Sequence, residues 1–324
     1  MTTTAVFHQL PVTRDEVLAC SFDQWYPKLK AYTPASKIIA IPPDFHRFLD
    51  QDSIRLPGDA NNKVEEVDDS DDETTQQDVW SDELIDFYNQ VNSLVGDFPF
   101  PKLNWSAPKD ARWINANTLR CHSADDVLLL LKSSDHAGDD LTAPFSEVSE
   151  GEDKSIDTVS FKLILRRWVD INPSHEFRVF IRDGTIIGAS QRDLNHYPHL
   201  VENREKHKQT ITNFVPNIVN KLGMKSFVLD LYIPETGEPM VIDVNPFSRK
   251  SSPLLYTWHE LIEGGDHDLR VVDENNLGRF KTMEYSESMV PTDVVGAAHD
   301  AEQMAELARE WRQLEQRGEE AAKE

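Results

Sequence analysis

The alternation of apolar and polar residues is clearest between positions 160 and 245, where it predicts a series of β-strands. Successive side chains of a strand point to opposite faces, so apolar residues at every second position indicate one buried face. Asp183 and Gly184 predict a two-residue hairpin turn between two of these strands, because glycine accepts positive φ. A shorter apolar run at 37–41, closed by two prolines, predicts a further buried strand. The strands expected in the main block are 160–168, 176–181, 185–191, 227–233 and 240–245.

Helical signals precede this block and interrupt it once. Thr13 and Glu16 have the spacing of a capping box, which predicts a helix that Pro27 ends. Ser81 is the expected N-cap of a second helix, and 204–222 is expected to form a long third one. The second helix carries apolar residues on one face: Leu84, Tyr88, Val91 and Val95.

Polar stretches without apolar periodicity divide the chain. An acidic run at about 60–79 predicts a disordered loop, since it buries too little apolar surface to offset the entropy of ordering. A second polar stretch, at about 133–157, predicts a mobile insertion. We therefore expect an N-terminal lobe at 1–155, a β-rich lobe at 156–280 and an acidic tail at 281–324. The fold class expected is α+β, with two lobes that share a cleft.

The expected tail also has a narrow apolar stripe at helical spacing. Its members are Met304, Leu307, Trp311 and Leu314. Such a stripe packs either on its own domain or on a partner, and the sequence leaves both interpretations open.

Charge and cysteine content narrow the class of protein. The formal net charge of -24 over 324 residues argues against a nucleic-acid backbone or an anionic membrane as partner and favours a basic protein surface. Cys20 and Cys121 are too few for a disulfide framework. No apolar run reaches membrane-spanning length, and the first residues lack the pattern of a signal peptide. We expect a soluble, monomeric protein of the cytoplasm.

Two acidic residues on neighbouring strands suggest a metal site. Strand parity puts Asp230 on one face of its strand, and Val241, Asp243 and Asn245 on one face of the next. A hairpin brings the two carboxylates and the carboxamide oxygen together, and burying like charges is costly without a cation. Mg²⁺ prefers such oxygen ligands. A solvated face with incidental acids is the alternative.

A proline-bounded loop at 101–111 carries groups that suit phosphate. Lys102, Lys109, Ser106 and the backbone amides between them supply positive charge and hydrogen-bond donors. A solvated loop explains the two lysines equally well.

Arginines gather near three of the expected strands. The guanidinium fork suits phosphate, although ion pairs with the many local acids are an equal alternative. The clusters are Arg166-Arg167-Trp168, Glu176-Phe177-Arg178 and Gln191-Arg192-Asp193. A regular turn at Asp183 and Gly184 places Arg178 and Arg192 on opposite faces, so both reach one ligand only if a bulge shifts the parity.

Several familiar signatures are missing from the sequence. It has neither GxGxxG nor GxxxxGK[ST], which argues against a Rossmann or Walker nucleotide site. It also lacks the HExxH pattern of a zinc protease and the GxSxG elbow of a hydrolase.

An ordered set of motifs resembles the cell division cycle protein 123 family of eukaryotes. The motifs are FPKLNWSAPKDA at 100–111, LRRW at 165–168, EFR at 176–178, SQRD at 190–193 and IDVNPF at 242–247. The resemblance covers roughly 22–263. It implies an ATP-grasp-like fold that binds Mg-ATP between two lobes. It also implies a role in assembling eukaryotic translation initiation factor 2 through binding of its gamma subunit.

The resemblance assigns roles to particular residues. Asp230, Asp243 and Asn245 match the metal positions. Lys102 matches the phosphate-contacting lysine, 106–110 lies over the nucleotide, and 166–168 matches the adenine hinge. The residues that it assigns to ATP are Lys102, Ser106, Ala107, Lys109, Asp110, Arg166, Arg167, Trp168, Arg178, Arg192, Asp230, Asp243 and Asn245.

The chain departs from ATP-grasp enzymes in two respects. Those enzymes have Glu-x-Asn where this chain has Asp243-Val244-Asn245, and they have a glycine-rich flap that this sequence lacks. We therefore expect an assembly chaperone that uses ATP as a ligand with little or no turnover. The alternatives are a ligase that forms an acyl phosphate and a scaffold with a vestigial nucleotide site.

Overall fold

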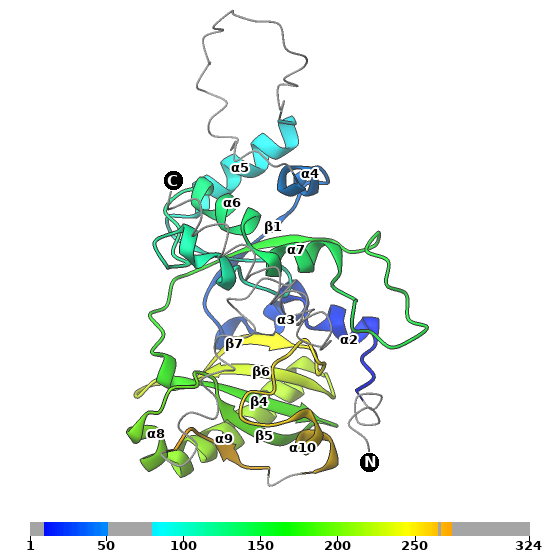
Figure 1. Ribbon diagram of the computed structural model, residues 1–324. Coiled ribbons are helices and arrows are strands. Elements are labelled where there is room, and N and C mark those ends of the chain that lie inside the picture. The colour runs from blue at the N-terminus through cyan, green and yellow to red at the C-terminus, as the bar shows by residue number, and fades with distance from the viewer. Residues whose placement is uncertain (1–9, 51–79, 265–266, 274–324) are drawn as a thin grey trace, which may run out of the picture. The chain divides into compact units, whose positions relative to one another are not determined.

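The computed structural model describes residues 10–50, 80–264 and 267–273, which fall within one compact unit. The predicted acidic loop at 60–79 and the predicted tail at 281–324 lie outside the described residues. Two β-sheets, one of three strands and one of five, organise the described part (Figure 1). Among the described helices, none combines the length and apolar character needed to cross a membrane.

The three-stranded sheet has the order β1-β3-β2 and is antiparallel throughout. Its strands are β1 (Ser36–Ala40), β2 (Phe100–Lys102) and β3 (Lys162–Arg166). The central strand is buried on both faces, because Leu163 and Leu165 pack in one apolar cluster and Ile164 in another. The strand predicted at 160–168 is β3, and it pairs with two strands of the predicted N-terminal lobe. The predicted boundary between the lobes, at 155/156, therefore falls between β3 and its two partner strands.

The five-stranded sheet has the order β7-β6-β4-β5-β8 (Figure 1). Its strands are β4 (Glu176–Arg182), β5 (Thr185–Gln191), β6 (Phe227–Tyr232), β7 (Met240–Asn245) and β8 (Leu269–Arg270). All pairs are antiparallel except β5 with β8. The predicted strands in this sheet are confirmed to within one residue at each end. The turn between β4 and β5 has the expected positive φ, 50° at Asp183 and 75° at Gly184.

Helices cover both faces of this sheet. On one face, α9 (Arg204–Leu222) confirms the long helix predicted at 204–222 and packs Ile211, Val215 and Ile218 into the core. On the other face, α10 (Trp258–Glu263) contributes Trp258 to a smaller cluster with Phe180.

The N-terminal helical region differs from the prediction. Two helices form, α2 (Arg14–Ala19) and α3 (Phe22–Leu29), and Pro27 lies inside the second instead of ending the first. The capping box of Thr13 and Glu16 is present as expected. Proline removes a helical hydrogen bond, but α3 buries three aromatic side chains and a leucine, and that burial outweighs the local cost.

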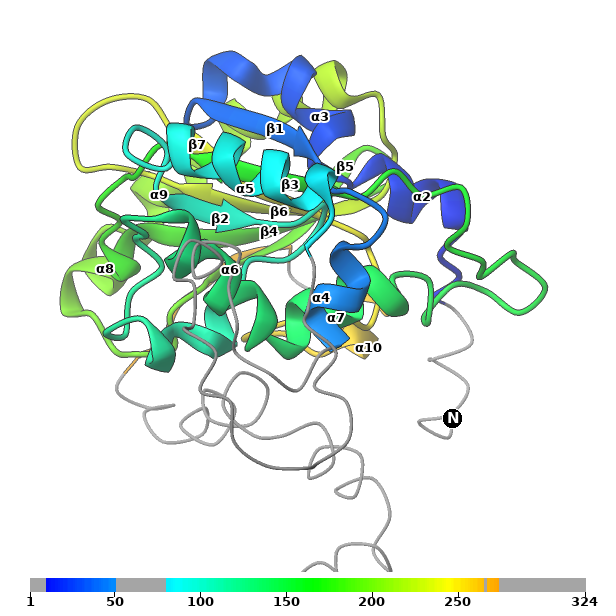
Figure 2. The same ribbon diagram turned by 90° about the horizontal axis from the view of Figure 1, so that it is seen from above.

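The remaining helices pack mostly around the three-stranded sheet (Figure 2). They are α4 (Phe45–Asp50), α5 (Asp82–Leu94), α6 (Ala124–Lys132), α7 (Asp135–Thr142) and α8 (Pro198–Glu202), with 3-10 turns η1 (Lys30–Tyr32), η3 (Lys109–Ile114) and η4 (Pro173–His175). The predicted N-cap of α5 is confirmed, since Ser81 accepts a hydrogen bond from the Leu84 amide at 3.1 Å.

The stretch 133–157 differs most from its prediction as a mobile insertion. It contains α7, and it contributes Leu141, Phe145 and Val148 to the buried core. Its apolar residues are few, but most of them are buried. The average composition therefore underestimates the order of this segment.

Candidate functional site

The β6–β7 hairpin brings the predicted acidic residues together. Asp230 and Asp243 lie directly opposite each other, so their side chains share one face of the sheet. The Asn245 Nδ2 atom lies 3.3 Å from Asp230 Oδ2. The expected common face of these three residues is confirmed.

A bulge in β7 changes the rest of the predicted pattern. Register shifts beside Asp230, so that Leu231 faces Val241 and Leu229 faces Val244. Both valines consequently point into the core, where each is at most 1% exposed. The prediction that Val241 shares a face with Asp243 is wrong, because the extra residue at the bulge reverses the parity.

A second bulge, in the β4–β5 hairpin, decides where two arginines point. Register shifts between Phe180 and Ile181, and Arg178 then lies opposite Ser190. The Arg192 amide donates to the Glu176 carbonyl at 2.9 Å, which continues the same register. Arg178 and Arg192 therefore share a face, as the bulged alternative requires.

Both arginines converge on Asp230, which is only 4% exposed. Arg178 donates from Nε to Oδ1 at 2.7 Å and from Nη2 to Oδ2 at 2.9 Å, and Arg192 Nε lies 3.5 Å from Oδ2. Burial raises the pKa of Asp230, but the charges of Arg178 and then Arg192 outweigh it and hold that pKa well below its usual range. Asp230 is thus a fully ionised buried carboxylate.

Asp243 takes its partner from the other sheet. Lys102, on β2, donates from Nζ to the two carboxylate oxygens at 2.8 and 3.0 Å and to the Trp105 carbonyl at 2.9 Å. The lysine side chain is 1% exposed, whereas that of Asp243 is 20% exposed. Lys102 is thereby one of the residues that join the two sheets.

Arg166 forms a second connection between the sheets. It donates from Nη1 to the Ile242 carbonyl at 2.9 Å and from Nη2 to Thr33 Oγ1 at 3.0 Å. Burial lowers its pKa to about 10. Its buried Nε has no hydrogen-bond partner among the residues that the structure describes. Of the other two residues of the predicted hinge, Arg167 is exposed, and Trp168 donates to Asp170 at 2.7 Å.

The loop expected to cover the nucleotide is held by α7. The Asp140 carboxylate accepts from the Ser106 amide at 2.7 Å and from its hydroxyl at 2.8 Å. Asp110 accepts from the Ser134 hydroxyl at 2.6 Å. The side chains of Ser106 and Asp110 are therefore engaged within the protein, while the half-buried Ala107 offers only backbone groups.

Lys109 is the basic residue of this loop that faces solvent. The charge of Arg192, and then burial, lower its pKa to about 8. Its side chain is exposed, so the repulsion from Arg192 is the main cause of this lowered pKa.

The cluster as a whole carries more positive than negative charge. Five cationic residues surround three carboxylates. They are Lys102, Lys109, Arg166, Arg178 and Arg192, against Glu176, Asp230 and Asp243. This balance of two excess positive charges is complementary to a polyphosphate that carries a divalent metal.

The donor set has the chemistry that Mg²⁺ prefers. Asp230, Asp243 and Asn245 offer only oxygen ligands, and the two carboxylates lie in register. Each carboxylate already has a basic partner, so a metal must share or replace those contacts. Among the described residues, no group of three His, Cys, Asp or Glu side chains is placed to hold a metal ion.

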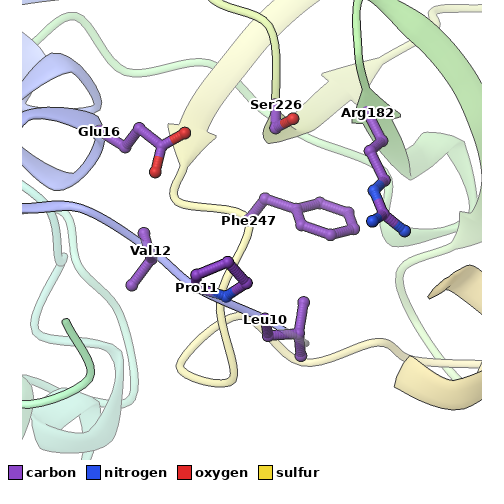
Figure 3. A pocket seen from close by; sticks show the side chains of 7 residues that line it. All are labelled: Leu10, Pro11, Val12, Glu16, Arg182, Ser226 and Phe247. Atoms are coloured by element: carbon purple, nitrogen blue, oxygen red, sulfur yellow. The ribbon is translucent and has the colours of Figure 1, made fainter. Parts of the chain in front are cut away.

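A separate cavity of about 140 Å³ lies elsewhere in the molecule (Figure 3). Phe247 lies between Pro11 and Arg182 in it, and none of the residues that resemblance assigns to ATP lines it. Its volume is well below the roughly 300 Å³ at which small-molecule pockets begin. The charged cluster, and not this cavity, is the candidate site.

Comparison with known families shows which family this chain belongs to. The family model described as D123 matches residues 25–298. This chain belongs to the D123 family. Its curated relatives include a "Translation initiation factor eIF2 assembly protein" of Candida albicans, 41% identical over 95% of this chain and 96% of the relative. The protein of the same name from Lodderomyces elongisporus is 40% identical over 97% of this chain and 95% of its own length.

A solved structure of the D123 family has the same fold. C-terminally truncated Cdc123 from Schizosaccharomyces pombe aligns with a TM-score of 0.68 and 31% identity, over 82% of this chain and all of that one. The match and the mixture of helices and sheets confirm the expected α+β fold class.

Asp140, which holds the loop beside the charged cluster, carries no distinguishing signal in the sequence. Asp140 lies in a polar stretch with several other acids, and no spacing distinguishes it from Asp135 or Asp139. Only its burial and its three hydrogen bonds mark it.

Proposed function

We propose that this protein is an ATP-dependent assembly chaperone for eukaryotic translation initiation factor 2. It binds Mg-ATP at the charged cluster and binds the gamma subunit of that factor. The observation that carries the nucleotide part is the convergence of Arg178 and Arg192 on Asp230, beside the Lys102–Asp243 pair. The printed names of the family relatives support the assembly part.

Asp230, Asp243 and Asn245 are the residues that would hold the metal. Bound Mg²⁺ supplies positive charge to the phosphate oxygens. Lys109 and Arg192 present their charges to the same phosphates, and 166–168 is assigned to the adenine by resemblance. Phosphate binding satisfies part of the positive excess that the free protein carries.

The partner is a protein surface of basic character. A chain with a net charge of -24 repels nucleic acid and anionic membranes and attracts basic protein surfaces. We propose that the free protein is a monomer that acts in the cytoplasm, where translation is initiated.

ATP acts as a ligand that favours one arrangement of the protein. A ligand stabilises whichever conformation binds it better, by an amount set by the difference in affinity. Hydrolysis is not required for such an effect. Mg-ATP and a slowly hydrolysed analogue should therefore support binding of the gamma subunit about equally.

Titration calorimetry with Mg-ATP, followed by pull-down of the purified gamma subunit, tests this function. We expect Asp243→Ala to lose Mg-dependent ATP affinity and to bind the subunit more weakly. Asp97→Ala is the matched control, because Asp97 is exposed and lies in the turn after α5. Rapid ATP turnover stimulated by a small carboxylate or amine, with no nucleotide effect on subunit binding, would overturn the proposal in favour of a ligase.

A further inference from the structure

Helix α7 and its N-cap residue contact the loop 105–110 at both ends of the loop. At one end, Asp140 accepts hydrogen bonds from the amides of Trp105 and Ser106 at 3.1 and 2.7 Å. At the other end, the α7 N-cap Ser134 donates to Asp110. A helix is a rigid element with a fixed rise per residue, so these two attachments set the span of the loop.

Asp140 is a buried carboxylate whose oxygens accept hydrogen bonds from the loop. It is 6% exposed and accepts a third hydrogen bond, from the Ser106 hydroxyl, at 2.8 Å. Burial raises the pKa of Asp140, whereas its bonds to Ser106 and the charge of Lys102 oppose that rise. A buried carboxylate without such donors is strongly unfavourable, so its bonds also bind the loop to the helix.

Trp105, in this loop, connects Asp140 with the charged cluster. Trp105 donates its amide to Asp140, and its carbonyl accepts from Lys102 Nζ at 2.9 Å. Lys102 in turn holds both oxygens of Asp243. A continuous series of contacts therefore runs from α7 through Trp105 and Lys102 to the proposed metal position.

We propose that Asp140 is a positioning residue for the nucleotide site. It acts through the loop 105–110, whose Trp105 carbonyl keeps Lys102 in place on Asp243. This inference rests on the proposed function, since it concerns the ATP that the cluster is proposed to bind. Asp140 itself need not contact the nucleotide.

Asp140→Asn tests the proposal with little change in shape. The variant keeps one acceptor oxygen but loses the charge, so its hydrogen bonds with Trp105 and Ser106 weaken and the loop should be held less firmly. We expect Mg-ATP affinity to fall about tenfold, a change of about 1.4 kcal/mol. Asp139→Asn is the matched control, because Asp139 lies on the same helix, is exposed and undergoes the same change of charge. Its affinity should stay within about twofold of the wild type, the range of a neutral surface substitution.

Hydrogen exchange without nucleotide provides a readout that does not depend on ATP. In Asp140→Asn, exchange should rise in the peptide that contains 105–110 and stay unchanged in the five-stranded sheet. Faster exchange throughout the chain would overturn the proposal, because it would indicate a general structural role. Should Asp140→Asn fail to fold, Ser134→Ala tests the other attachment with the same two measurements.

The outcomes separate this inference from the proposed function. If the wild type does not bind Mg-ATP, the proposed function fails and the proposed role of Asp140 in the nucleotide site fails with it. If the wild type binds and Asp140→Asn binds equally well, only the positioning role is overturned. Weaker Mg-ATP binding by the variant, together with faster hydrogen exchange only in the loop, supports the positioning role.

Discussion

The two sides of the charged cluster are built differently. On the side of the five-stranded sheet, Asp230 and Arg178 lie on paired strands and Arg192 directly follows β5, so the ion pairs among them are local to this sheet. On the other side, Lys102 and Arg166 reach across from the three-stranded sheet to β7. The first side is fixed by strand pairing, whereas the second depends on how the two sheets pack. Its contacts are therefore the ones that a bound ligand alters at lower cost.

The largest effect is expected from Arg178→Met. It leaves the buried Asp230 carboxylate with the longer contacts to Arg192 and Asn245, and breaking a buried ion pair costs about 3–5 kcal/mol of unfolding free energy. Urea denaturation measures the loss. The double variant with Asp230→Asn should recover part of it, because the uncompensated charge is gone. Arg182→Met on the same strand is the control, at below about 1 kcal/mol. A loss no greater than that of the control would contradict the importance of this pair.

Lys102→Met should have a smaller effect on stability. Asp243 keeps access to water, since its side chain is 20% exposed, so its unpaired charge costs about 2 kcal/mol. The five-stranded sheet should keep its protection from hydrogen exchange, whereas the contact between the sheets should weaken. If Lys102→Met destabilises the protein more than Arg178→Met does, the distinction between the two sides is wrong.

The smallest effect concerns acid stability on the side of the five-stranded sheet. His207 on α9 packs on Phe177 of β4, with ring centroids 5.0 Å apart, and burial followed by the charge of His175 lowers its pKa to about 4. The unfolded chain binds this proton near pH 6.5, before the folded protein does. The contribution of the neutral His207 to the free energy of unfolding is therefore present above pH 6.5 and is lost as the pH falls toward 4.

Denaturation at two pH values measures that contribution. Between pH 7.5 and pH 5.5 the free energy of unfolding should fall by about 1 kcal/mol on account of His207. In His207→Phe this part of the pH dependence should disappear, while the Lys102–Asp243 contact is unaffected. An unchanged pH dependence in the variant would show that the pKa of His207 is the same in the folded and unfolded protein.

Much of the five-stranded sheet could be predicted because its signals are local. The strands β4 to β7 and the turn at Asp183 follow from periodicity over a few residues, and so does the common face of Asp230 and Asp243. The bulges could not be predicted, because an extra residue in a strand changes the side-chain parity without leaving a distinct residue type. Only the bulge in the β4–β5 hairpin was indicated in advance, because Arg178 and Arg192 can reach one ligand only if such a bulge is present.

The sequence by itself determined the strands and helices of the β-rich region, the face shared by the acidic residues, and membership of a family through its ordered motifs. Tertiary structure alone decided which sheet β3 joins, that Pro27 stays within a helix, and that Asp140 binds the loop at 105–110. The physical reason is the range of the interactions. Periodicity and capping depend on neighbours within one or two turns. Burial and the pairing of buried charges depend on residues that are distant in the chain, and their energies are large enough to override local preference.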